Sequence, residues 1–143
     1  MIDTLLLGQT LCFSGDPFKA PWTEVTSHRR DGAVLLRGGK IAEVGSRATL
    51  CQAHPQAEMV DYGTDLIVPG FVDAHVHYPQ TAIIASWGKR LIDWLNSYTF
   101  PEEMRLADPD YAAKIAGRYL DIALTHGTTT MASYCTTAPV SVT

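Results

Sequence analysis

Two histidines, His75 and His77, stand two positions apart at the end of the apolar, β-branched run LIVPGFVDAHVHYPQ, residues 66–80. Residues two apart on a β-strand project from the same face, so Asp73, His75 and His77 are predicted to point one way. Neutral imidazole is a common metal ligand, and two imidazoles side by side make half of a metal site. Because a catalytic zinc takes about three protein ligands and keeps one position open for water, the remaining ligands must come from elsewhere.

The other polar candidates have simpler interpretations. Asp73 shares the parity of the two histidines but lies further from the strand end, which favours packing, or a role beside the ligands, over direct ligation. His126 precedes Gly127 and is interpreted as a histidine at a helix C-terminus, where the helix dipole favours it. His28 and His54 fall in polar stretches and are expected to be solvated loop residues without a role.

The first 68 residues predict a small layer of short-looped β-structure. Gly38 and Gly39 stand between two strand-like runs, and this pattern predicts a tight hairpin because type I′ and II′ turns require positive φ. The strand 59–68 is expected to break near Tyr62 and Gly63. The expected elements are strands at 4–13, 33–37, 40–44 and 59–68, and a short helix at 46–53.

From Pro69 onward the pattern changes to strand, helix, helix, strand, an alternation that builds parallel sheets and barrels. Asp108 is a good N-cap for a helix that starts with Pro109, and Gly127 suits the left-handed position after its end. The expected elements are strands at 71–77 and 128–134 and helices at 81–97 and from 109 to the residues before Gly127. Four aromatic residues of this region are expected to pack in the core more readily than to wall a ligand site: Trp87, Trp94, Tyr98 and Phe100.

Composition excludes several classes of function. With 46% hydrophobic and 18% charged residues the chain matches an ordinary soluble globular protein. Its net charge of −4, without a continuous basic stripe, argues against nucleic acid and anionic lipid as partners. No apolar run approaches a membrane span, and the N-terminus lacks a basic leader, so a cytoplasmic protein is expected. The three widely spaced cysteines form no C-x-x-C pair and are expected to be reduced.

Several motifs carry a family resemblance. The run PGFVDAHVH, residues 69–77, resembles the metal-binding signature that opens the barrel of the amidohydrolase superfamily. Further stretches are similar to the guanine deaminase family in particular: HYPQ at 77–80, DWLN at 93–96, YTFP at 98–101 and HGTTT at 126–130. The resemblance implies an α/β fold in which residues 1–68 are the N-terminal part of a small β-sandwich domain. Residues 69–143 would then be the first β/α units of a (β/α)₈ TIM barrel.

The same resemblance implies a reaction and a set of site residues. The reaction is hydrolytic deamination of guanine to xanthine and ammonia, with Zn²⁺ lowering the pKa of water toward neutrality. His75 and His77 carry over as metal ligands. Gln80 carries over as a side chain that contacts the purine, since an amide offers a base edge both a donor and an acceptor. The resemblance also implies a homodimer.

The chain departs from the family pattern in length. A full barrel takes about 250 residues, whereas only about 75 follow Pro69 here, enough for two strands. The remaining metal ligand and the proton-transferring groups are therefore expected beyond Thr143, and the chain is expected to be an N-terminal fragment that is inactive alone. Two alternatives stay open. One is another amidohydrolase that acts on a cyclic amide or a different amino-heterocycle, and the other is a non-catalytic truncated product with an interaction role.

Overall fold

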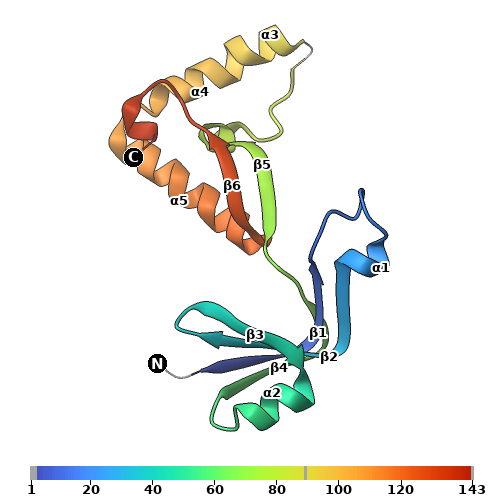
Figure 1. Cartoon of the computed structure of the whole chain (residues 1–143). Helices are drawn as coiled ribbons and strands as arrows, with labels where there is room; N and C mark the ends of the chain where they lie inside the picture. Colours follow the sequence, from blue (N-terminus) through green and yellow to red (C-terminus); the bar gives the residue numbers. More distant parts are fainter. Residues whose placement is uncertain (1–2, 89, 143) are drawn as a thin grey trace. The chain divides into compact units, whose positions relative to one another are not determined.

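The structure of the chain is a computed structural model that describes residues 3–88 and 90–142. The chain divides into two compact units, residues 1–69 and 70–143, and each is described by itself below. Figure 1 labels the strands and helices along the chain. Within the described residues, no helix is both long enough and apolar enough to cross a bilayer.

The first unit is built on a four-stranded sheet in the order β3-β2-β1-β4. β1 pairs antiparallel with β2 and parallel with β4, and β2 pairs antiparallel with β3. The strands are β1 (Thr4–Phe13), β2 (Thr26–Arg37), β3 (Lys40–Ser46) and β4 (Glu58–Ile67), and the helices are α1 (Trp22–Val25) and α2 (Arg47–Ala53).

The core of this unit lies between α2 and the two middle strands. Strand alternation brings Leu5 and Leu7 of β1 to one face, where they are buried together with Ala33 and Leu35 of β2. Leu50 of α2 closes this cluster. Burying each such leucine stabilises the fold by roughly 1.5–3 kcal/mol, so the alternation along β1 and β2 also sets the position of α2.

The hairpin prediction is confirmed, because Gly38 and Gly39 adopt φ values of 59° and 75° between β2 and β3. The predicted start of β2 at Ala33 is wrong, since the strand begins at Thr26. Its first half is polar and lacks alternation, and it is held by pairing with the end of β1, where Thr26 lies opposite Phe13. Such pairing between distant segments leaves no local signal in the sequence.

Two histidines of this unit have partners that the sequence did not indicate. His28 lies in β2, and its Nε2 atom is 3.1 Å from Oε1 of Gln9. His54 follows α2 and places Nε2 at 3.0 Å from Oε1 of Glu43. The prediction that His28 is a loop residue is therefore wrong, because it lies in β2, although its side chain is exposed as predicted. His54 lies in a loop as predicted, but its side chain is only partly exposed beside Glu43.

The second unit contains a parallel two-stranded sheet of β5 (Phe71–His77) and β6 (Thr128–Tyr134). Both strands have the predicted bounds, and the α/β prediction is confirmed. In Figure 1 the two strands run side by side, and α5 lies along them. The helical segments are η1 (Tyr78–Ile83), α3 (Leu91–Trp94), the π-helix η2 (Leu95–Thr99), α4 (Phe100–Arg105), α5 (Pro109–Thr125) and η3 (Pro139–Ser141).

The predicted caps of α5 are confirmed. Oδ1 of Asp108 accepts hydrogen bonds from the backbone N–H groups of Asp110 at 2.9 Å and Tyr111 at 3.4 Å. Gly127, just past the helix, has φ 82°. A capping carboxylate satisfies N–H groups that have no partner within the helix, so the start of α5 can be predicted from Asp108 and Pro109.

The predicted continuous helix at 81–97 is wrong. The 3₁₀ turn η1 ends at Ile83, Ala85 adopts the left-handed φ of 63°, and helical structure resumes only at Leu91. Between them the chain lies close against the following helix, because a Cβ on Gly88 would stand 2.7 Å from Cβ of Trp94. The path of the chain between the two segments therefore leaves no room for a side chain at Gly88, although the apolar spacing of 81–97 alone suits a helix.

A close approach also explains Gly70, which opens β5. A Cβ at this position would stand 2.0 Å from Oγ1 of Thr129. The pairing of β5 with β6 shifts register between Phe71 and Val72, which places an extra residue in β6 at Thr129. Only glycine leaves room for that side chain, so Gly70 permits the first pairing of the sheet.

Candidate metal centre and the adjoining hollow

The two histidines at the end of β5 face each other. Their Nε2 atoms lie 3.3 Å apart and their ring centroids 5.3 Å apart. Two nitrogens bound to one tetrahedral Zn²⁺ at 2.0–2.1 Å would stand about 3.3–3.4 Å from each other. Both the type of donor and the separation therefore fit His75 and His77 as ligands of one cation. The same separation also lets one ring donate an Nε2–H to the other, a role set by the tautomer.

An irregularity in the sheet lies just before this pair. Asp73 pairs with Met131 and Val76 with Ser133, so β5 holds one more residue than β6 across this step. Oδ1 of Asp73 accepts a hydrogen bond from the backbone N–H of His75 at 3.1 Å. Bulges of this kind re-aim side chains and recur beside active sites. Asp73 thus binds the backbone that carries His75.

The metal site is incomplete within residues 3–88 and 90–142. Among them no group of three or more His, Cys, Asp or Glu side chains is placed to hold a metal ion. A catalytic zinc takes about three protein ligands, so the two histidines supply part of a ligand set.

Tyr134, at the end of β6, packs against both imidazoles. Its ring centroid lies 4.7 Å from that of His75 and 4.9 Å from that of His77, and its plane is within 15° of the His77 ring. Tyr134 is the register partner of His77. The sequence reasoning missed this residue, although the equal lengths of the two predicted strands place their last residues side by side.

A hollow of about 330 Å³ adjoins the histidines, a volume within the usual range for small-molecule sites. We call it the histidine hollow. His75, His77 and Gln80 line it, with Trp94 and Tyr119 among its walls. Gln80 therefore lies in the same hollow as the two candidate ligands.

Backbone and side-chain contacts shape the walls of this hollow. The indole N–H of Trp94 donates to the carbonyl of Ser86 at 3.1 Å, which ties α3 to the irregular segment before it. Ala85, also in the wall, holds its left-handed φ at a cost of roughly 1–2 kcal/mol for a residue with a Cβ.

Burial, with a smaller contribution from the charge of Asp73, raises the pKa of Tyr119, so its phenol stays protonated at neutral pH.

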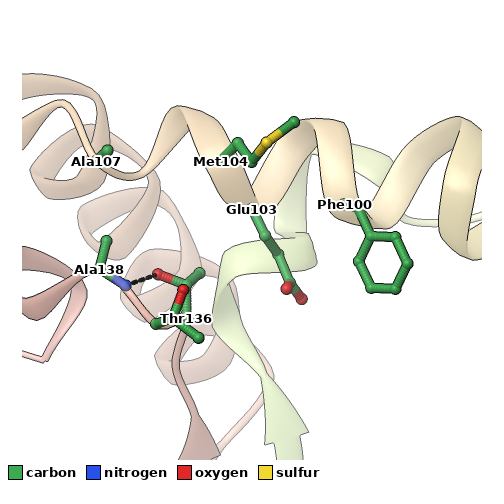
Figure 2. Close-up of a pocket in the computed structure, with 7 residues that line it drawn as sticks. Phe100, Glu103, Met104, Ala107, Thr136 and Ala138 are labelled. Carbon is green, nitrogen blue, oxygen red and sulfur yellow. Dashed lines mark hydrogen bonds between the residues drawn. The ribbon is translucent and has the colours of Figure 1, made fainter.

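Gln80 has a carboxylate partner that the sequence reasoning missed. Nε2 of Gln80 donates to Oε1 of Glu103 at 3.0 Å. Glu103 also lines a second hollow of about 390 Å³, shown in Figure 2, between α4 and the segment after β6. In that view its side chain points away from α4 toward the pale green segment that follows β5, and Thr136 accepts a hydrogen bond from the N–H of Ala138 on the other side.

The prediction that the four aromatic residues pack in the core is wrong. Trp87, Tyr98 and Phe100 are exposed, and Trp94 is half-buried at the histidine hollow. Trp87 and Tyr98 line a further hollow with Trp94, and Phe100 lines the one in Figure 2. For Trp87 and Trp94 the interruption of the predicted helix is the reason, since it removes the single face on which these two side chains would have aligned.

Comparison with known proteins assigns the class. Residues 66–142 match the model of the amidohydrolase family, and residues 32–57 match that of the imidazolonepropionase-like composite domain of bacteria. The first match covers more than half of the chain and includes both strands of the second unit. The chain belongs to the amidohydrolase family.

Individual relatives narrow the class. The chain is 40% identical over 113 residues to guanine deaminase of Escherichia coli (strain K12), a match that covers 78% of this chain and 26% of the relative. Its fold matches the crystal structure of guanine deaminase from Bradyrhizobium japonicum with a TM-score of 0.91 and 32% identity, over 99% of this chain and 31% of that one.

A third relative has been seen with a ligand. The crystal structure of guanine deaminase from C. acetobutylicum, with bound guanine in the active site, matches with a TM-score of 0.72 and 29% identity, over 93% of this chain and 30% of that one. The chain thus spans about a quarter to a third of the length of these guanine deaminases.

Proposed function

We propose that this chain supplies part of the active site of an enzyme that hydrolyses guanine to xanthine and ammonia. The observation that carries the proposal is the Nε2 pair of His75 and His77, 3.3 Å apart, at a hollow that also contains Gln80. The likeness to guanine deaminases, one of which holds guanine in its active site, supports guanine as the substrate.

His75 and His77 would hold Zn²⁺ through Nε2. The cation supplies Lewis acidity, which makes water nucleophilic near neutral pH. Tyr134 packs on both rings and restricts their rotation, so the two Nε2 atoms would already be oriented toward a common cation in the metal-free protein. The Asp73 bond to the His75 N–H fixes the backbone on which that ring stands. Each contact reduces the ordering that ligand binding would otherwise require.

Gln80 and the aromatic walls would bind the purine. The amide of Gln80 offers hydrogen bonds to a base edge, and Trp94 and Tyr119 offer apolar surface to a flat ring. In the net reaction, water adds to the ring carbon that carries the amino group, the C–N bond breaks, and the nitrogen leaves as ammonia. The third ligand and the groups that transfer protons in this exchange are expected outside the described residues.

The test uses the full-length product of the gene. Purified protein loaded with Zn²⁺ would be assayed for xanthine formation from guanine, with metal content measured on the same sample. A panel of other substrates, namely adenine, an S-alkylated adenosine and a cyclic amide, would be assayed in parallel. The proposal expects guanine to give the highest kcat/KM. A higher value for another member of the panel would assign the chain to a different amidohydrolase activity.

Three further expectations accompany this proposal. The 143-residue chain alone is proposed to be inactive, because its described residues bring together no group of three side chains that could hold a metal ion, and a catalytic zinc takes about three protein ligands. A cytoplasmic location and a homodimeric state stay predictions. Light scattering of the full-length product gives its mass in solution, and a monomer at micromolar concentration would contradict the dimer.

A further inference from the structure

We propose that Glu103 is a positioning residue that fixes which end of the Gln80 amide faces the histidine hollow, and so sets which base edge the site accepts. The inference rests on the proposed function. An ionised carboxylate only accepts hydrogen bonds, so the atom of Gln80 that lies 3.0 Å from Oε1 of Glu103 is the amide nitrogen. The reverse orientation would place two acceptor oxygens against each other.

Glu103 is itself held firmly, because its neighbours anchor α4. The buried carboxylate of Glu102 accepts hydrogen bonds from the hydroxyl of Tyr111 and, at 2.9 Å, from Nη1 of Arg105. The Arg105 guanidinium lies 3.9 Å from the centre of the Tyr111 ring, and Leu106 is fully buried. This cluster fastens α4 to α5, so Glu103 meets Gln80 from a fixed position.

The orientation decides what a ligand meets. With one N–H bound to Glu103, Gln80 keeps its carbonyl oxygen and a second N–H for the hollow that it lines with His75 and His77. These two groups complement a ring edge that carries an N–H donor beside a ring-nitrogen acceptor. Guanine has such an edge at its amino group and N3. A ring that offers only acceptors there would leave the Gln80 oxygen unpaired, which a partly buried site penalises.

The test substitutes Glu103→Gln in the full-length, Zn²⁺-loaded protein. A neutral amide accepts as readily as it donates, so Gln80 becomes free to turn over. We expect KM for guanine to rise by about twofold or more, with a smaller change in kcat, because an amide that adopts both orientations equally presents the required edge only half of the time. Metal content should stay unchanged. Glu58→Gln, an exposed acid of the first unit, is the matched control.

A double substitution separates positioning from mere packing. Gln80→Glu combined with Glu103→Gln keeps a hydrogen bond between the two positions but presents only carboxylate oxygen to the hollow. We expect this swap to leave guanine binding impaired. A normal KM for guanine in the swapped protein, or an unchanged KM in Glu103→Gln, would overturn the inference about Glu103. Turnover of guanine by the wild-type protein would still support the proposed function in that case.

A second measurement, made without guanine, tests whether Glu103 holds the Gln80 amide even if the wild-type protein forms no xanthine. The side-chain amide signal of Gln80, assigned by its loss in Gln80→Ala, would be followed by NMR hydrogen exchange. We expect slower exchange in wild type than in Glu103→Gln. Equal exchange rates would show that Glu103 does not hold the amide, whatever the substrate.

Discussion

The ring of Tyr134 stacks on that of His77, with centroids 4.9 Å apart and planes within 15°. Because Tyr134 also contacts His75, it restrains both candidate ligands from the neighbouring strand. Tyr134→Ala should therefore weaken binding of Zn²⁺ by about 10-fold or more, the range seen when partners of metal ligands are removed. Tyr134→Phe keeps the ring and should retain affinity. Competition with a chromophoric chelator measures both, and equal affinities for the two variants would contradict the role of the stack.

Replacing His75 or His77 by Ala in the full-length product should abolish stoichiometric Zn²⁺ binding and guanine turnover. Each change removes one of the two metal-binding Nε2 atoms that lie 3.3 Å apart, so the cation is left with too few ligands. Elemental analysis and xanthine formation report the two effects. His126→Ala is the control, since Nδ1 of His126 lies 2.8 Å from the carbonyl of Ile122 in its own helix. Full metal content in either strand variant would refute the assignment.

Gln80→Ala should raise KM for guanine and leave metal content unchanged. Gln80 lines the histidine hollow, and a base edge left without its partner costs about 1–3 kcal/mol. Steady-state kinetics with elemental analysis checks both parts. The exposed Gln52→Ala in the first unit serves as the control. An unchanged kcat/KM for guanine would remove Gln80 from the substrate site.

The 143-residue chain expressed alone should neither fold to a stable monomer nor deaminate guanine. Among the described residues β5 pairs only with β6, and parallel strands are stable chiefly when both faces and both neighbours are covered. Phe71 and Val72 of β5 are 60% and 69% exposed, which leaves apolar surface uncovered. Thermal unfolding, solution mass and a xanthine assay test these points. A cooperative melt of a monomer would refute the folding claim, and Zn²⁺-dependent xanthine formation would refute inactivity.

Asp61 should contribute a pH dependence to stability. Its hydrogen bond to the Arg47 guanidinium, with a second from the backbone N–H of Gly63, lowers its pKa in the folded state. A lowered folded pKa means that the stabilisation is present above the unfolded value of about 4 and is lost as pH falls through the folded value. Asp61→Asn in the full-length product should therefore lower Tm near neutral pH. The difference in Tm between this variant and wild type should become smaller in acid.

Thermal melts between neutral pH and about pH 2 measure this difference. Asp65→Asn is the matched control, because Asp65 lies on the same strand and takes part in no ion pair among the described residues. A gap between Asp61→Asn and wild type that stayed constant with pH would contradict the assigned ion pair with Arg47.

The sequence by itself determined the elements whose signals are local. The bounds of β5 and β6, the start of α5 at Asp108 and the hairpin at Gly38 follow from β-branched runs, a capping carboxylate and glycines that tolerate positive φ. The shared face of His75 and His77 follows likewise from the period of a strand. Each of these features depends on residues within a few positions of one another.

Only the tertiary structure decided the features that depend on distant partners. The first half of β2 forms because β1 pairs with it, with Thr26 opposite Phe13. The bond between Gln80 and Glu103 joins residues 23 positions apart. Bringing remote segments together costs loop-closure entropy, and the tertiary contacts that offset this cost leave no pattern in the local sequence. The candidate ligands and Asp73 could therefore be identified from the sequence, whereas the packing of Tyr134 against both imidazoles was not predicted.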